Sequence, residues 1–378
     1  MKFVLFYHSL VSDWNHGNAH FLRGVVAELQ SRGHQVEVHE PEDAWSVAQL
    51  VADHGEDAIA QWQARYPQLR SHRYRHDRFD VDEALDGADV ALVHEWNEPS
   101  LVADIGNRAP AACRVFFHDT HHRSVSAPDD MARYDLRGYD GVLAFGEAVR
   151  RRYLDNAWCE RAFTWHEAAD PRVFHPLEKP EEPDGDLVWI GNWGDDEREA
   201  ELREYLVEPV RELGLRARLH GVRYPAHALA MLRNAGIEYR GWLPNWRAPE
   251  VFARYTATVH VPRRPYARLL PGIPTIRVFE ALACGIPLVS APWDDVEHLF
   301  APGRDFLVAR DGAQMRDHLR MLVADPSAAS ELAAHGLATV LARHTCAHRV
   351  DELLSIVSSL AASTGTPARS TSRSLSHA

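Results

Sequence analysis

Residues 274–290 read PTIRVFEALACGIPLVS, a stretch that combines a helix start, a helix end and a buried strand. The turn at Pro274 and Thr275 can start a helix, Gly285 can cap it, and Pro287 cannot extend it. The apolar residues that follow predict a buried strand. A helix that leads directly into such a strand is typical of α/β proteins with parallel sheets.

The beginning of this helix predicts an anion site. Free N–H groups and the positive end of the helix dipole both suit a diphosphate. Glu280 lies inside the helix, where its carboxylate can accept hydrogen bonds from two ribose hydroxyls, as acids do in dinucleotide-binding folds. A buried structural helix in which Glu280 pairs with Arg277 is the alternative interpretation.

The remaining sequence divides into two series of strands and helices. Apolar runs in the first half predict strands at residues 2–7, 35–39, 89–94, 114–118 and 141–145. The second half predicts strands at residues 186–191, 217–220, 257–260 and 287–290. Residues 42–80 are charged and rich in His and Arg, and they can form an insertion over the first domain.

These series predict an α/β protein with two Rossmann-like parallel-sheet domains that face a central cleft. Residues 1–164 form the first domain, and the proline- and charge-rich residues 165–183 form a hinge or linker. Residues 184–362 form the second domain, with a last helix able to cross back, and residues 363–378 form a disordered tail. Ligands of open α/β sheets bind at the carboxyl ends of the strands, so we expect the site in the cleft.

The composition indicates a soluble globular protein. A formal charge of −13 argues against a nucleic-acid partner but still allows a few arginines to bind one diphosphate. None of the four cysteines belongs to a CxxC pair, so neither a zinc site nor a disulfide framework is indicated. Without a signal-peptide pattern or an apolar run of membrane-spanning length, we expect a cytoplasmic protein, for which peripheral membrane contact stays open.

A family resemblance follows from these segments. Residues 274–300, PTIRVFEALACGIPLVSAPWDDVEHLF, resemble the donor-binding segment of GT-B glycosyltransferases of the retaining group-4 type. The resemblance extends to DLVWIGNWGDDERE at 186–199, to GRDFLVARDG at 303–312 and, more weakly, to FFHDTHHR at 116–123. The chain looks closest to the spore-maturation CgeB-type glycosyltransferases. The resemblance implies a GT-B fold and transfer of a sugar from a nucleotide-diphosphate donor.

The resemblance also implies roles for residues near the helix start. Glu280 corresponds to the glutamate that binds the donor ribose, and the backbone N–H groups of Thr275 and Ile276 face the diphosphate. Many relatives carry a second glutamate eight residues earlier, where this chain has Gly272. The paired motif is incomplete, which puts a glutamate contact to the donor sugar in doubt.

Gly191 and Asn192 follow a predicted strand, and a glycine there permits close approach to phosphate or ribose. An ordinary strand-to-helix turn is the alternative. Many relatives have an arginine and a lysine where this chain has Asn192 and Glu197. We expect arginines elsewhere to bind the diphosphate, because a guanidinium group offers it two parallel hydrogen bonds. The candidates are Arg263, Arg264 and Arg277, ahead of Arg198 and Arg223.

The histidine-rich residues 118–122, HDTHH, follow a buried strand. The resemblance maps His118 onto the cleft histidine of many retaining relatives, where an imidazole can bind a sugar hydroxyl and orient the leaving group. The three histidines and Asp119 could instead bind a metal, or His118 could be a structural residue. The spacing matches no standard metal-ligand pattern, so we predict no metal site.

Four further residues are candidates for the cleft. Gly17 lies in a loop after the first strand, where relatives bring such a loop to the donor diphosphate or the acceptor. Glu95 and Trp96 could line an acceptor pocket, and the backbone of Trp242 could contact the nucleobase. Core packing is an equal explanation for both tryptophans.

We therefore expect a glycosyltransferase that uses a sugar nucleotide and an unknown acceptor, which is a glycan, a lipid or a small molecule. Retention of the anomeric configuration follows from the resemblance alone. No Asp-x-Asp motif stands in the cleft, so we expect transfer without a metal or another cofactor. The alternatives are another GT-B reaction, such as sugar-nucleotide epimerisation, and a non-catalytic protein that binds sugar nucleotides.

Overall fold

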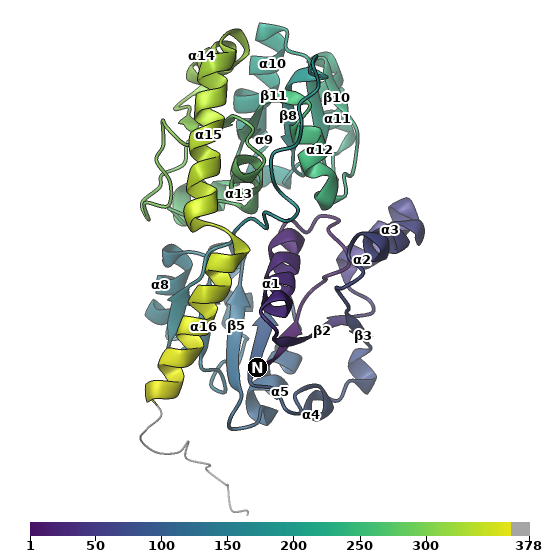
Figure 1. Ribbon diagram of the computed structural model, residues 1–378, viewed down its shortest axis with the longest axis vertical. Helices are drawn as coiled ribbons and strands as arrows, with labels where there is room; N and C mark the ends of the chain where they lie inside the picture. The colour runs from purple at the N-terminus through teal and green to yellow at the C-terminus, as the bar shows by residue number, and fades with distance from the viewer. Residues whose placement is uncertain (364–378) are drawn as a thin grey trace, which may run out of the picture.

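The computed structural model describes residues 1–363. They form two α/β halves stacked end to end, with the second half uppermost in Figure 1. The tail expected at residues 363–378 lies outside the described residues, except for Ser363, which ends the last helix.

The first half is built on a parallel sheet with the strand order β3-β2-β1-β4-β5-β6-β7. Its strands are β1 (Lys2–Phe6), β2 (Gln35–Pro41), β3 (His72–Tyr74), β4 (Val90–His94), β5 (Arg114–Asp119), β6 (Gly141–Ala144) and β7 (Ala162–Thr164). The five predicted strands are confirmed. The edge strands β3 and β7 were not predicted, because each has three residues and no apolar run. The segment 42–80 supplies β3 and two helices.

The second half repeats this arrangement with the strand order β10-β9-β8-β11-β12-β13, again all parallel. Its strands are β8 (Gly185–Ile190), β9 (Ala217–His220), β10 (Ile237–Tyr239), β11 (Tyr255–His260), β12 (Leu288–Ser290) and β13 (Leu307–Val308). In both sheets the strand order reverses beside the first strand, at the switch point where doubly wound sheets bind ligands. The predicted fold class is confirmed.

Helices cover both sheets (Figure 1). In the first half they are α1 (Ala19–Ser31), α2 (Trp45–His54), α3 (Asp57–Arg65), α4 (Val81–Ala84), α5 (Pro99–Arg108), α6 (Arg123–Ser126), α7 (Pro128–Met131) and α8 (Glu147–Asp155). The next are α9 (Glu199–Leu202), α10 (Glu208–Leu213), α11 (Ala226–Asn234), α12 (Ala248–Phe252), α13 (Ile276–Ala283), α14 (Gly312–Ala324), α15 (Pro326–Arg343) and α16 (Cys346–Ser363). Two π-helical turns, η3 (Arg203–Val207) and η5 (Pro265–Leu269), lie in the second half.

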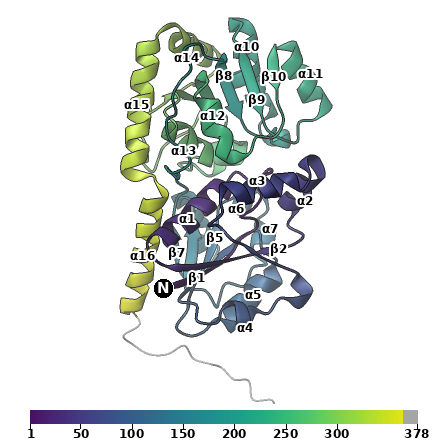
Figure 2. The ribbon, with the colours of Figure 1, turned by 45° about the vertical axis from the view of Figure 1, so that its right-hand side comes forward.

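The chain crosses between the halves twice. Helix α15 covers the second half, and α16 then descends beside α1 of the first half (Figure 2). The two crossing segments are joined by backbone hydrogen bonds, because Ala169 donates to His344 and accepts from Cys346. In addition, Trp165 Nε1 donates to the Arg349 carbonyl in α16 at 2.8 Å. The last helix is therefore part of the first half's core.

Shortening a core side chain of α16 tests this packing. Leu353 is fully buried, so Leu353→Ala is expected to lower the free energy of unfolding by about 2–5 kcal/mol. Leu341 in α15 is 48% exposed and serves as the matched control, with an expected change within about 0.5 kcal/mol. Urea unfolding followed by tryptophan fluorescence measures both. Equal changes in the two variants would contradict the assigned packing.

Candidate active site

A cleft of about 540 Å³ lies between the carboxyl edges of the two sheets. The first half contributes the loops after β1, β4, β5, β6 and β7 together with the start of α2. The second half contributes the ends of β8 and β11, the loops after β8, β9 and β11, and the start of α13. The halves also touch across it, since Asn192 Nδ2 donates to Asn15 Oδ1 at 2.5 Å.

The helix start predicted from residues 274–290 is the start of α13, and it faces the cleft. Thr275, Ile276 and Arg277 all line the cleft. Thr275 has extended backbone and does not cap the helix; its hydroxyl lies instead 3.1 Å from His260 Nε2. Gly17 approaches so closely that a Cβ there would lie 3.3 Å from the Ile276 side chain. The loop containing Gly17 and the start of α13 therefore meet at the cleft.

Gly191 and Asn192 line the cleft as well. The Asn192 Oδ1 atom accepts the backbone N–H of Val222 at 3.0 Å, which fixes the amide group that reaches Asn15. A Cβ at Gly191 would lie 2.7 Å from the ring of Trp189, so the turn after β8 requires a residue without a side chain.

Arg198 is a cleft cation without an internal counter-ion. Within residues 1–363, no carboxylate forms an ion pair with its guanidinium group, which donates to the carbonyl oxygens of Asn192, Trp193 and Val261. Burial and the neighbouring Arg263 lower its pKa to about 9, so the group stays charged near neutral pH. An anionic ligand would supply the missing negative charge.

Three further arginines line the cleft, each beside a carboxylate. The pairs are Arg263 with Glu197 at 2.6 Å, Arg223 with Asp195 at 3.1 Å, and Arg277 with Glu280. Arg264, which was expected among them, does not line the cleft. Its side chain lies 3.3 Å from Glu201 and lines a neighbouring pocket.

Glu197 connects the two walls of the cleft. Its Oε2 atom accepts from Arg263 of the second half and lies 3.4 Å from Nε2 of His122 of the first half. Burial disfavours the charged form, but His122 and Arg263 hold the pKa of Glu197 at about 2. The carboxylate is therefore ionised at neutral pH and occupies an arginine that could otherwise bind a phosphate.

Glu280 is fully buried beneath Arg277 and does not itself line the cleft. His20 Nδ1 and Asn245 Nδ2 donate to its Oε1 atom at 3.0 and 2.9 Å, and Arg277 pairs with Oε2. Burial alone would raise its pKa, but Arg277, His20 and Asn245 together hold the pKa below its ordinary value. From the sequence, the alternative to a ribose contact of Glu280 is an ion pair with Arg277. The structure has this ion pair.

The structure places His118 in the core rather than in the cleft. Its side chain is fully buried, 4.8 Å from the Trp165 ring and 5.5 Å from the His94 ring, measured between centroids. Burial lowers its pKa to about 3, so it is neutral. Alternate residues of a strand face opposite sides, and β5 continues through Asp119, so His118 lies inside the sheet.

His121 and His122 line the cleft instead. Asp119 Oδ1 accepts the backbone N–H of His121 at 2.9 Å and so fixes the turn after β5. Burial lowers the pKa of His121 well below its ordinary value, and the charges of His122 and Arg263 add to this effect. Its Nδ1 atom has no hydrogen-bond partner within residues 1–363. His121 therefore presents a neutral imidazole able to bind a ligand hydroxyl.

Of the two residues expected on the acceptor side, Trp96 lines the cleft and Glu95 does not. Trp96 lines the cleft with 41% of its surface exposed, and Arg123 stacks 4.5 Å from its ring centroid. Glu95 is fully buried beneath the cleft, where Thr120 donates to Oε1 at 3.2 Å. Burial and Asp119 raise the pKa of Glu95 well above its ordinary value. Glu95 thus supports the loops of the site without lining it.

The side chain of Trp242 packs outside the cleft. It stacks on His54 with 4.6 Å between ring centroids, and its Nε1 donates to Asp13 at 3.0 Å. These contacts join the loop after β10 to the first half. The side chain of Trp242 thus packs half-buried between the halves, and the contact of its backbone with a nucleobase stays a prediction.

Trp45 and Glu167 are among the cleft residues that were not predicted. Trp45 begins α2, is 46% exposed and faces the cleft from a segment with no clear periodicity. Glu167 follows the unpredicted strand β7, so its carboxyl was taken as a linker charge. Arg198, which the sequence ranks behind Arg263, Arg264 and Arg277, lines the cleft soon after the glycine turn at Gly191.

Two searches concern other kinds of site. Among residues 1–363, no group of three or more His, Cys, Asp or Glu side chains has the geometry to hold a metal ion. In the same part of the chain, no helix is long and apolar enough to span a membrane.

Comparisons with known proteins agree with this geometry. Residues 198–355 match a protein family described as glycosyl transferase-like. Sucrose-phosphate synthase from Thermosynechococcus elongatus is similar in structure, with a TM-score of 0.66 and 12% identity over 96% of this chain and 100% of that chain. Anabaena HepE in complex with UDP and glucose has a TM-score of 0.67 and 13% identity over 95% and 100%. No curated protein matches the sequence.

An alpha-glucosyltransferase solved with UDP and a 13-mer DNA is a further similar structure. Its TM-score is 0.69, with 12% identity over 95% of this chain and 99% of that chain. At such identities the likeness shows the fold, and the predicted GT-B fold is confirmed. The family match adds that residues 198–355 form a glycosyl transferase-like region, in agreement with the predicted class.

Removal of the unpaired cation tests whether the cleft binds anions. Arg198→Gln is expected to weaken the binding of inorganic pyrophosphate about tenfold or more, because a charge-assisted hydrogen bond is lost. Arg268, in the neighbouring turn η5, is 70% exposed, and Arg268→Gln is the matched control with unchanged affinity. Isothermal titration calorimetry measures both. Wild-type affinity in Arg198→Gln would show that this guanidinium does not face the anion.

Proposed function

We propose that this protein transfers a sugar from a nucleotide diphosphate to an acceptor bound by the first half. The observation that carries the proposal is Arg198, a cation without a carboxylate partner, in the cleft into which the start of α13 opens. The combined charge of the arginines and the free N–H groups of a helix start suits a diphosphate. Relatives solved with UDP support this choice of ligand.

The proposed donor complex needs one exchange of partners. Arg277 covers Glu280 and pairs with its Oε2 atom. If the ribose hydroxyls replace Arg277 at this oxygen, the released guanidinium can bind the diphosphate beside Arg198 and Arg263. The diphosphate would likewise compete with Glu197 for Arg263. This exchange reconciles the ribose role of Glu280 with its burial in this structure.

We assign the imidazole role in the cleft to His121 rather than to His118. His121 is neutral, lines the cleft and has an unpartnered Nδ1 atom, so it can hold a hydroxyl of the donor sugar while the diphosphate leaves. The arginines would stabilise the charge that develops on the leaving diphosphate. Retention of configuration is part of the proposal because of the resemblance to group-4 transferases.

The acceptor is proposed to lie against the first half. Trp45 and Trp96 are both exposed to the cleft, and their flat apolar faces suit the ring of a sugar or another small molecule. A glycan, a lipid or a small molecule all remain candidates. The net charge of −13 disfavours a nucleic-acid acceptor. We place the reaction in the cytoplasm and propose that it needs no metal and no cofactor beyond the sugar nucleotide.

A donor panel tests the function as a whole. Purified protein is incubated with UDP-, GDP-, ADP- and dTDP-sugars, and slow release of the free nucleotide diphosphate is expected with one of them. Chromatography of the nucleotides measures the release. A changed sugar without release of diphosphate would indicate an epimerase, and binding without any turnover would indicate a non-catalytic binder.

Two histidine variants separate the roles in residues 118–122. His121→Ala is expected to lower kcat about a hundredfold, because a group that assists the leaving diphosphate is lost. His118→Leu removes an imidazole from the core and is expected to keep kcat within about threefold. Steady-state donor hydrolysis measures both, and circular dichroism checks their folding. The reverse pattern would return the catalytic role to His118.

Metal independence has its own test. Turnover with the donor from the panel is expected to be the same, within about twofold, in excess EDTA and in added Mg²⁺ or Mn²⁺, because arginines would supply the positive charge. A similar structure, T4 phage BGT, was solved with UDP and Mn²⁺, so both ions belong in the assay. Loss of turnover in EDTA that Mn²⁺ restores would contradict this part of the proposal.

A further inference from the structure

Glu167 presents an unsatisfied carboxyl group to the cleft. It follows β7 in the first crossing segment, is 2% exposed and lines the cleft. The backbone N–H of Ile276, at the start of α13, lies close enough to the carboxyl group to lower its pKa. Its Oε1 atom has no hydrogen-bond partner within residues 1–363. A buried oxygen without a partner is costly, so a ligand group at this point would remove the cost.

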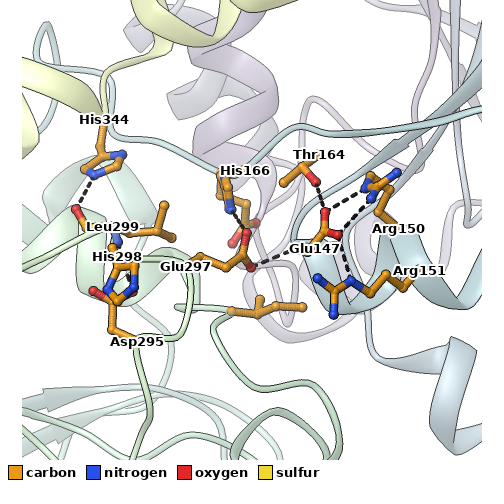
Figure 3. Close-up of polar contacts among 12 residues, drawn as sticks. Glu147, Arg150, Arg151, Thr164, His166, Asp295, Glu297, His298, Leu299 and His344 are labelled. Atoms are coloured by element: carbon orange, nitrogen blue, oxygen red, sulfur yellow. Dashed lines mark hydrogen bonds and ion pairs between the residues drawn. The ribbon is translucent and has the colours of Figure 1, made fainter.

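The backbone of Glu167 is anchored on both sides. Arg349 of α16 donates from Nε to the His166 carbonyl at 2.9 Å. Glu297 of the second half binds His166 Nε2 through Oε2 at 2.9 Å and accepts the Glu147 N–H through Oε1 at 3.0 Å (Figure 3). Both halves thus hold the residue before Glu167 and fix the backbone from which its side chain reaches the cleft.

Gly272 explains why a carboxyl group is needed from elsewhere. Many relatives have a glutamate at this position, but here its φ is +87°, a conformation that favours glycine. A Cβ at Gly272 would lie 2.7 Å from the Val296 side chain and 3.0 Å from that of Glu297. Glu297 is itself engaged with His166, whereas Glu167 keeps a free oxygen.

The electrostatics of Glu167 suit a hydroxyl rather than a cation. Burial raises its pKa well above the ordinary value, and the nearby Glu280 carboxylate raises it further, against the opposing effects of Arg277 and the Ile276 N–H. These effects favour the protonated form of the carboxyl group, which can both donate and accept a hydrogen bond. A neutral group at the start of α13 also leaves the helix end attractive to a diphosphate.

We infer that Glu167 binds a hydroxyl group of the donor's sugar, in place of the glutamate that is missing at position 272, and that it helps to select the sugar. The inference rests on the proposed function. It assigns a sugar contact to the crossing segment, which also joins the two halves. Closure of the cleft and recognition of the sugar would then depend on the same residues.

The test compares ligands with and without the sugar. Calorimetry measures the affinities of wild type and Glu167→Leu for the pairs UDP and UDP-glucose, GDP and GDP-mannose, ADP and ADP-glucose, and dTDP and dTDP-glucose. For the pair of ligands that binds, we expect Glu167→Leu to lower the affinity for the sugar nucleotide about tenfold. The affinity for the free nucleotide diphosphate should fall less than about twofold. Glu167→Gln, which can still donate and accept, should restore most of the loss. Glu178→Leu, an exposed position in the same segment, is the matched control with unchanged affinities.

The outcomes separate the inference from the function on which it rests. Equal weakening of both members of the pair, or no weakening, would overturn the sugar contact while the nucleotide site survives. If wild type binds none of the eight ligands, the proposed function fails and the inference with it. If Glu167→Leu does not fold, the affinities of wild-type protein for modified donors test the inference instead. Donor analogues that each lack one ring hydroxyl should include one that binds about tenfold more weakly, and equal affinities for all of them would overturn the inference.

Discussion

The buried carboxylate of Glu280 is the interaction on which the arrangement of the two halves depends. An ionised carboxylate away from water is stable only when hydrogen bonds and opposite charge surround it. Here the partners are His20 in α1, Asn245 in the turn before α12 and Arg277 in α13. Because His20 Nε2 also accepts the N–H of Asp170, one carboxylate connects the first half, the linker and the second half.

This connection also positions the cleft. Glu280 and the start of α13 belong to one short helix, so fixing the carboxylate fixes the N–H groups that face the ligand. The hydrogen bonds of Ala169 with His344 and Cys346 hold the second crossing beside the first, and α16 packs on α1. The N–H groups at the start of α13 are therefore already in place when a ligand binds, which lowers the entropy lost on binding.

The sequence predicts the parts of this design that depend on local pattern. Continuous apolar runs reveal parallel strands buried on both faces, and the turn before α13 reveals the helix start. Which side chains face the cleft is less predictable. Strand β5 ends at Asp119, one residue later than predicted, so His118 still belongs to the strand and is buried. His121 lies in the loop that follows and lines the cleft. Arginine roles depend on partners distant in sequence, such as Glu201 beside Arg264, so residue type alone could not rank Arg198 above Arg264.

The carboxylates beside the cleft arginines make anion binding at this site an exchange of ion-pair partners. Within the described residues, Arg198 has no internal counter-ion, whereas Arg223, Arg263 and Arg277 each have one. A single small anion would find one available cation and would have to displace carboxylates to gain others. Two linked phosphates can make several such displacements in one binding event. With the proposed donor, these charge pairs would discriminate by valency and favour a nucleotide diphosphate over orthophosphate.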